Sequence, residues 1–113
     1  MATPYAFASR SDLFDRWSRL ESAIDDTDLD PVLITWCRVR ARVLFGASPP
    51  QSSIEPPAPD IEEFAEQFWM DAHGISDALA ERVRLLLGDG PTVALVVLLG
   101  LSEVDVRTEL MFA

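Results

Sequence analysis

Residues 30–46 read DPVLITWCRVRARVLFG and predict one amphipathic helix with a defined start and end. Asp30 can accept a hydrogen bond from a backbone N–H of the first turn, and the proline that follows suits the first helical position. Gly46 is expected to end the helix, because glycine readily adopts the left-handed conformation that follows many helices. Four apolar residues recur at helical spacing and are expected to face the core: Val32, Trp36, Val39 and Val43.

One helix is also expected before this stretch and another after it. Ser11 is placed to cap the first, whose inward residues are Leu13, Trp17, Leu20 and Ile24. Asp60 is placed to cap the later helix, with Glu63 completing a capping box and Gly74 as the C-terminal cap. The apolar stripe of this later helix consists of Ile61, Phe64, Ala65, Phe68 and Ala72.

Two more helices are expected toward the end of the chain. Ser76 opens one of them, with a break at residues 88–90 and an inward stripe of Leu79, Val83, Leu86 and Leu87. Pro91 begins the other, which is apolar on all sides through Leu101, and a kink or restart near Gly100 is left open. Five prolines within residues 46–59 predict an extended connector. We therefore expect a single all-α domain, residues 1–113, forming a small bundle of about five helices with a Pro-rich connector after the second.

Composition limits the classes of partner. The 113-residue chain has a formal net charge of −10, and all nine basic residues are arginine. Phosphate binding needs a concentrated basic face, so no nucleic-acid partner is expected. The longest nearly unbroken apolar run, residues 93–101, is less than half of the ~20 residues that a bilayer demands. With no secretory signal visible at the start, we expect a cytoplasmic protein with no membrane partner.

The basic residues cluster only at Arg38, Arg40 and Arg42. On a helix, Arg38 and Arg42 share a face, and Arg40 is turned away from them by roughly 160°. These side chains either pair with acidic neighbours of the same protein, for which residues 60–66 supply several carboxylates, or bind a ligand anion.

Two stretches of the chain resemble the alkyl hydroperoxidase D and carboxymuconolactone decarboxylase superfamily. The first is LDPVL at residues 29–33 with RVRARVLFG at residues 38–46, which is similar to the helix that leads into the family's cysteine pair. The second is FAEQF at residues 64–68, HGISD at residues 73–77 and the apolar helix from Thr92, which is similar to the family's C-terminal helix triplet. The resemblance implies an all-helical, AhpD-like fold that tends to oligomerise.

The chain departs from this family at its redox centre. The redox members carry Gly-Cys-x-x-Cys backed by a nearby histidine, and one thiolate attacks the peroxide while the second resolves it. Ala47 and Pro50 stand at the two cysteine positions, and no histidine follows within the next twenty residues. The helix that should carry the second cysteine is replaced by the proline-rich connector. None of the family's catalytic residues therefore transfers to this chain.

Cys37 is the only cysteine of the chain. The neighbouring Arg38 could favour its thiolate, and a single cysteine can act as a peroxidatic thiol with an external reductant. The alternative is that Cys37 lies beside the buried stripe as a small hydrophobic residue.

His73 is the only histidine, and it alone has an ordinary pKa close to neutral pH. If the third helix extends this far, His73 shares a face with Glu66, Trp69 and Met70, and a Glu66–His73 pair would be a plausible acid/base unit. The alternative is that His73 caps the last turn before Gly74. One histidine with scattered carboxylates gives no metal-ligand spacing, and no cofactor is implied.

Apolar residues fall on more than one face of two predicted helices. Trp69 and Met70 lie off the stripe of the third helix, and Leu95 and Leu99 lie off the line of Val93, Val97 and Val104. A subunit interface would cover such surface, and a bundle that buries it internally is the alternative. We therefore expect a non-catalytic homo-oligomer or a protein that binds a helical protein partner. The alternatives are a peroxidase using Cys37 and an acid/base catalyst using His73 and Glu66.

Overall fold

A computed structural model describes residues 11–47 and 54–112, and for residues 11–14 it describes the backbone alone. Within these two segments the chain forms five α-helices, one short 3-10 helix and no strand. The α-helices are α2 (Ser11–Asp25), α3 (Pro31–Leu44), α4 (Pro59–Asp71), α5 (Asp77–Leu87) and α6 (Asp89–Phe112), and the 3-10 helix η1 (Ala72–Gly74) follows α4. The expected all-α bundle of about five helices is confirmed.

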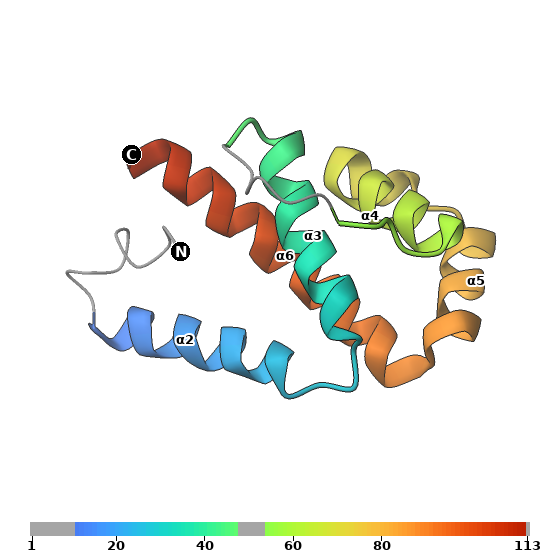
Figure 1. Cartoon of the computed structure of the whole chain (residues 1–113), viewed down its shortest axis with the longest axis horizontal. Helices are drawn as coiled ribbons and strands as arrows, with labels where there is room; N and C mark the ends of the chain where they lie inside the picture. Colours follow the sequence, from blue (N-terminus) through green and yellow to red (C-terminus); the bar gives the residue numbers. More distant parts are fainter. Residues whose placement is uncertain (1–10, 48–53, 113) are drawn as a thin grey trace.

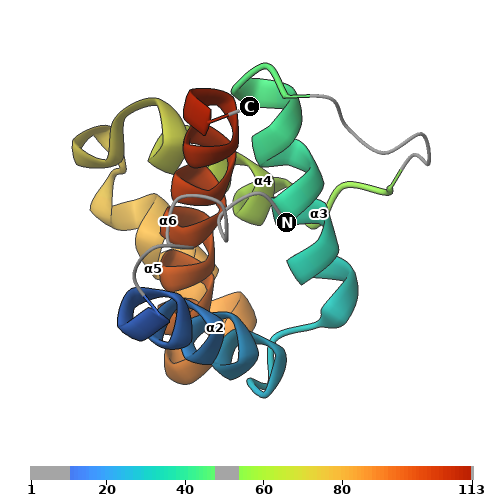
Figure 2. The ribbon, with the colours of Figure 1, turned by 90° about the vertical axis from the view of Figure 1, so that its left-hand side faces the viewer.

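The long helix α6 lies beside α3 at the centre of the molecule, and these two helices make the most extensive contact of the fold (Figure 1). Helix α2 lies on one side of this pair, whereas α4 and α5 lie on the other, as the view turned by 90° also shows (Figure 2). No single helix of residues 11–47 and 54–112 is long and apolar enough to cross a membrane. The α5–α6 pair that passes this test together is bent by 116°.

The core-facing side of α3 differs from the predicted one. Its buried residues are Leu33, Ile34, Trp36, Cys37 and Ala41. Trp36 is buried as expected, whereas Val32 and Val43 are exposed and Val39 is only half-buried. Cys37 and Ala41 have no exposed surface. These are the small members of a buried row that also contains Leu33 and Trp36, and small side chains let helices approach closely. The three valines lie outside this row.

Both predicted ends of α3 are confirmed. The Asp30 carboxylate accepts a hydrogen bond from the backbone N–H of Val32 at 2.9 Å, and Pro31 is the first helical residue. Gly46 follows the helix with a φ of 85°. The backbone N–H of Ala47 then donates to the carbonyl of Arg42 at 2.8 Å, and that of Gly46 reaches the carbonyl of Val43 at 3.4 Å. This pair of bonds is a Schellman motif, so buried Ala47 closes the helix end.

The predicted ends of α4 were wrong. Pro59 occupies the first helical position, so Ala58 stands at the N-cap. The N-cap therefore makes no side-chain hydrogen bond. Asp60 instead accepts a hydrogen bond at 3.2 Å from Arg82 and so ties α4 to α5. The α-helix ends at Asp71, and Gly74 closes the 3-10 turn that follows. Gly74 does not have the positive φ of a typical helix-ending glycine, because among the described residues only Gly46 and Gly88 have a positive φ.

The apolar stripe of α4 is confirmed in part. Ile61, Phe64 and Ala65 are buried and Phe68 is half-buried, but Ala72 is exposed. In the predicted connector, residues 54–58 have no regular structure, Pro59 belongs to α4, and residues 48–53 lie outside the described part of the chain.

The stripe expected on the first helix is likewise confirmed in part. Trp17 and Ile24 of α2 are buried, whereas Leu20 is exposed, and the side chain of Leu13 lies outside the described part. In α5, the Ser76 hydroxyl caps the helix by accepting the backbone N–H of Leu79. Leu79 and Val83 are buried, but Leu86 faces solvent.

Helix α6 begins earlier than predicted, and one side of it faces the core. It starts at Asp89, with Pro91 inside its first turn, and continues through Gly100 without a break. Leu95 and Leu99 are fully buried, together with Leu98, and form the core-facing side. The line of Val93, Val97 and Val104 is exposed. Because almost every position from 93 to 101 is apolar, periodicity could not select the inward face.

Candidate functional site between helices α2, α3 and α6

The three arginines of α3 each reach a different helix. Arg38 pairs with Glu21 of α2 at 3.1 Å, Arg40 with Glu66 of α4 at 2.7 Å, and Arg42 with Glu109 of α6 at 2.5 Å. Pairing with acidic neighbours is therefore confirmed for all three. The predicted source of the carboxylates was right for Arg40 alone, because residues 60–66 lie on α4 and face only that side of α3. The arginines tie α3 to the three helices around it.

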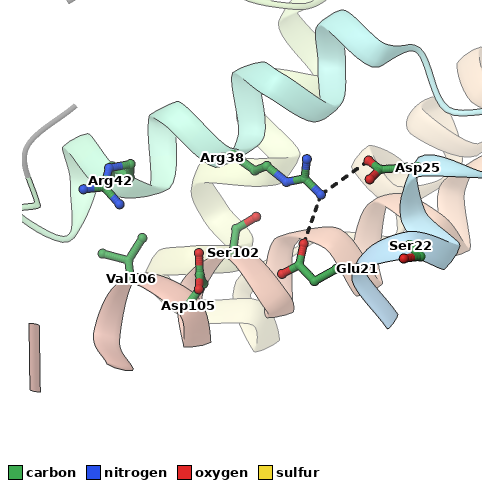
Figure 3. A pocket seen from close by; sticks show the side chains of 8 residues that line it. All are labelled: Glu21, Ser22, Asp25, Arg38, Arg42, Ser102, Asp105 and Val106. Carbon is green, nitrogen blue, oxygen red and sulfur yellow. Dashed lines mark hydrogen bonds and ion pairs between the residues drawn. The ribbon is translucent and has the colours of Figure 1, made fainter. Parts of the chain in front are cut away.

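A pocket of about 340 Å³ opens where α2, α3 and α6 meet. Its polar lining consists of three carboxylates, two guanidinium groups and two serine hydroxyls, of which only that of Ser102 is buried: Glu21, Asp25, Asp105, Arg38, Arg42, Ser22 and Ser102. Figure 3 shows Arg38 reaching down from α3 between the two carboxylates of α2. Its Nη2 lies 3.1 Å from Glu21 Oε2 and 3.6 Å from Asp25 Oδ1. The pocket falls within the size range of small-molecule sites.

Glu21 is partly buried and lies close to other negative charges. Burial raises the pKa of the Glu21 carboxyl above its ordinary value, and the guanidinium of Arg38 only partly opposes this. The negative charges of Asp105 and Asp25 raise the Glu21 pKa further. Burial and these negative charges together outweigh the effect of the Arg38 guanidinium on the Glu21 pKa.

Ser102 is the other unusual group in this pocket. It comes from the core-facing side of α6 and is only 5% exposed. Its hydroxyl oxygen has no hydrogen-bond partner within the described part of the chain. In Figure 3 the hydroxyl points away from α6 into the space below α3. Buried hydroxyl groups in folded proteins are nearly always hydrogen-bonded, so this one is left free to bond with a water molecule or a ligand atom that enters the pocket.

The structure places the two acid/base candidates in different surroundings. Glu66 accepts two hydrogen bonds from the guanidinium of Arg40, at 2.7 and 3.0 Å. His73 lies beyond the end of α4, exposed on η1, where its backbone N–H donates to the Asp71 carboxylate. The helical face that was expected to bring His73 beside Glu66 ends at Asp71, so the predicted i, i+7 spacing does not apply. Of the other two residues on that face, Trp69 is buried and Met70 is 79% exposed.

Cys37 lies inside the core, with no exposed surface. Burial raises the pKa of its thiol to about 12, although Arg38 opposes this shift. A reactive cysteine needs a lowered pKa and access to its substrate. The surroundings of Cys37 are those of a small hydrophobic side chain.

No family model, curated protein or solved structure matches this chain. Within residues 11–47 and 54–112, no group of three or more His, Cys, Asp or Glu side chains could hold a metal ion. Sequence reasoning identified Arg38 and Arg42 as neighbours on one helix face but missed Glu21, Asp105 and Ser102. The sequence signal that could have identified Ser102 is its position on the same helix face as Leu95, Leu98 and Val106.

Proposed function

We propose that this protein acts by pairing with a second copy of itself through the outer face of α6, and that it is not an enzyme. One observation carries the proposal: α6 has a second apolar face, opposite the core. Val93 is 64% exposed, Val97 39% and Val104 44%, and the three recur with Gly100 at spacings of four, three and four residues. This alternation is the spacing of a helix–helix seam.

The seam is complementary to itself. An antiparallel pairing about a two-fold axis between Gly100 and Leu101 sets Val97 against Val104 of the second copy, twice. It also sets the half-buried Leu101 opposite Gly100, where no side chain lies within 4 Å of an added Cβ and the space is open to a partner side chain. Contacts of this kind make the isologous interface of a two-fold dimer.

The surroundings of the catalytic candidates support a non-catalytic role. Cys37 is enclosed by the core, and Glu66 is engaged by Arg40 while His73 is exposed on a separate turn. We therefore expect no turnover in a peroxide-reduction assay with a dithiol donor. Turnover that disappears in Cys37→Ser or His73→Ala would contradict this part of the proposal.

We also propose that the scaffold is a degenerate relative of the alkyl hydroperoxidase D and carboxymuconolactone decarboxylase superfamily. Support comes from the order of the helices and from two helix ends that lie where the resemblance predicts them, at Gly46 and Ser76. At the first cysteine position, Ala47 is buried and closes the Schellman motif of α3. A small apolar residue there serves packing.

The pairing is tested by measuring molar mass in solution with light scattering at micromolar concentration. We expect twice the 12.5 kDa of one chain. Val97→Glu is expected to give single chains, because it places a charge in the apolar seam, while the far-UV circular dichroism stays helical. A wild-type protein that is strictly monomeric, or a Val97→Glu variant that still pairs, would overturn the proposal.

Met70→Glu is the matched control. Met70 is a large exposed apolar residue on α4, so the substitution adds the same charge away from the seam of α6. We expect this variant to keep the mass of the wild type. If Met70→Glu alone separates the copies, the interface lies on α4 and not on α6.

A further inference from the structure

We infer that the pocket between α2, α3 and α6 binds a small organic cation with N–H donors, an alkyl amine or diamine. This pocket lies on the core-facing side of α6, away from the seam proposed for pairing, so the two proposals are independent. The charged groups of the lining and one unpartnered hydroxyl carry the inference.

The charge of the site favours a cation. Three carboxylates and two guanidinium groups line it, and Arg42 is already held by a fourth carboxylate, that of Glu109. Arg38 is shared between Glu21 and Asp25. An anionic ligand would have to displace these carboxylates from their arginines, whereas a cation could pair with Glu21 and Asp25, which share a single guanidinium.

The Ser102 hydroxyl supplies a hydrogen-bond acceptor to such a ligand. It is 5% exposed, unpartnered within the described residues, and directed into the pocket (Figure 3). An ammonium group carries three donors and no acceptor. It could therefore donate to the hydroxyl oxygen and to a carboxylate at the same time, and so give the Ser102 hydroxyl the partner that the described residues do not supply.

Glu21 gains most from a bound cation. Its carboxyl is half-buried on the side of α2 that faces α6, and its pKa is raised by burial and by the negative charge of Asp105. A positive charge within a few ångströms would favour the carboxylate form. The aliphatic stems of Arg38 and Arg42, which line the pocket, suit the methylene groups of an alkyl chain.

Isothermal titration calorimetry of the full chain with putrescine, a four-carbon diamine, tests the inference. The titration is run at about 0.15 M salt, where the Debye length is about 8 Å and attraction to the net negative charge is largely screened. We expect saturable binding of one putrescine per chain and none of succinate, a dianion of the same carbon count. Absence of saturable putrescine binding, or binding of succinate in its place, would overturn the inference.

Two variants locate the binding site. Glu21→Gln is expected to weaken putrescine binding about tenfold, because it removes one charge-assisted hydrogen bond. Ser102→Ala is expected to weaken binding about threefold or more, because it removes the neutral acceptor. Alanine is the residue that α-helices accept best, so this variant keeps the test valid if Glu21→Gln does not fold.

Asp60→Asn is the matched control. It removes one negative charge from an interhelical ion pair, that with Arg82, on the α4–α5 side of the molecule. Its net charge therefore equals that of Glu21→Gln. We expect this variant to bind putrescine as the wild type does. Equal weakening in Glu21→Gln and Asp60→Asn would mean that the amine responds to net charge alone, and the inference would fail.

Discussion

At the scale of single residues, Ser102 is the side chain whose position is hardest to explain by stability. A buried hydroxyl without a partner costs about 1–3 kcal/mol relative to water, and serine is also a weaker helix former than alanine. We therefore predict that Ser102→Ala raises the free energy of unfolding by about 1 kcal/mol. Urea denaturation of the ligand-free protein measures this change. A loss of stability would mean that the hydroxyl has a partner in the folded protein.

Ser76→Ala is the natural comparison for that measurement. The Ser76 hydroxyl caps α5 by accepting the backbone N–H of Leu79 at 3.1 Å. Removing an N-cap of this kind costs about 1 kcal/mol. The same chemical change should thus stabilise the protein at one serine and destabilise it at the other. A residue that reduces stability while it lines a pocket fits a role in binding.

A second prediction at the residue scale concerns Cys37 and the pH dependence of the free energy of unfolding. Burial raises the pKa of its thiol from 9.0 to about 12 in the folded protein. The unfolded chain therefore loses this proton first, so the stability that the neutral thiol contributes is complete below pH 9 and is lost as pH rises toward 12. The loss approaches about 1.4 kcal/mol per pH unit within this window.

The Cys37 prediction is checked against Cys37→Ala. The difference in free energy of unfolding between wild type and variant should shrink by about 1.4 kcal/mol between about pH 8 and about pH 10. The alanine variant itself leaves a small cavity, which shifts the difference at every pH but does not change its slope. A difference that is independent of pH would mean that the thiol is open to solvent.

At the scale of elements, α3 is held by three ion pairs that point to three helices. The Arg42–Glu109 pair is the least exposed of these, with both side chains about one quarter exposed, and it is bidentate. Its hydrogen bonds lower the pKa of Glu109, so its contribution to stability is lost as pH falls through that lowered value. We predict a coupling free energy of about 1–2 kcal/mol from a double-mutant cycle with alanine at both positions.

The Arg107–Glu103 pair of α6 is the reference for this cycle. It joins residues four apart on one helix, and the arginine side chain is 58% exposed. Exposed pairs of this spacing contribute about 0.3–0.5 kcal/mol. The Arg42–Glu109 coupling should therefore exceed the Arg107–Glu103 coupling when both cycles are measured at the same pH and salt. Equal couplings would mean that the interhelical pair is as solvated as the exposed one.

Helix ends were easier to predict than helix faces. Asp30, Gly46 and Ser76 cap helices through contacts or backbone angles within a few residues of themselves, so the local sequence determines the cap. The exception is Asp60, which is displaced from the N-cap by the preceding proline and binds Arg82 of another helix. The inward faces of α3 and α6 depend on the helices that pack against them, and an almost uniformly apolar segment leaves that choice open.

The pocket could not be predicted for a related reason. Its lining comes from α2, α3 and α6, which are brought together only by the tertiary fold. The shared face of Arg38 and Arg42 was visible in the sequence, but their carboxylate partners, Glu21 and Glu109, lie 17 and 67 residues away. No local spacing relates such residues, so only the packing of the helices identifies the site.

At the scale of the whole molecule, the net charge opposes the pairing of two copies, whereas the exposed apolar surface of α6 favours it. Each chain has a formal net charge of −10, so two copies repel each other as they approach. The apolar seam of α6 must exceed this repulsion if the copies pair. Added salt screens the repulsion and leaves apolar burial intact. Pairing through α6 is therefore expected to strengthen as ionic strength rises.

The register of the proposed pair is open to a direct test by cross-linking. In an antiparallel pair about Gly100 and Leu101, residue 97 of one copy faces residue 104 of the other. We therefore predict that an equal mixture of Val97→Cys and Val104→Cys forms a covalent dimer under mild oxidation. Non-reducing electrophoresis measures the dimer. The native Cys37 is fully buried, so it does not compete for the new thiols.

Each variant alone is the control, because the antiparallel register keeps like residues apart. Residue 97 and its copy would be offset by seven positions along the seam, about 10 Å at the rise of an α-helix. A disulfide needs Cα atoms within about 7 Å, so neither variant should cross-link to itself. Parallel pairing reverses both outcomes, since it sets each residue against its own copy. Self-cross-linking of the single variants would therefore rule out the two-fold antiparallel seam, even if the protein is a dimer.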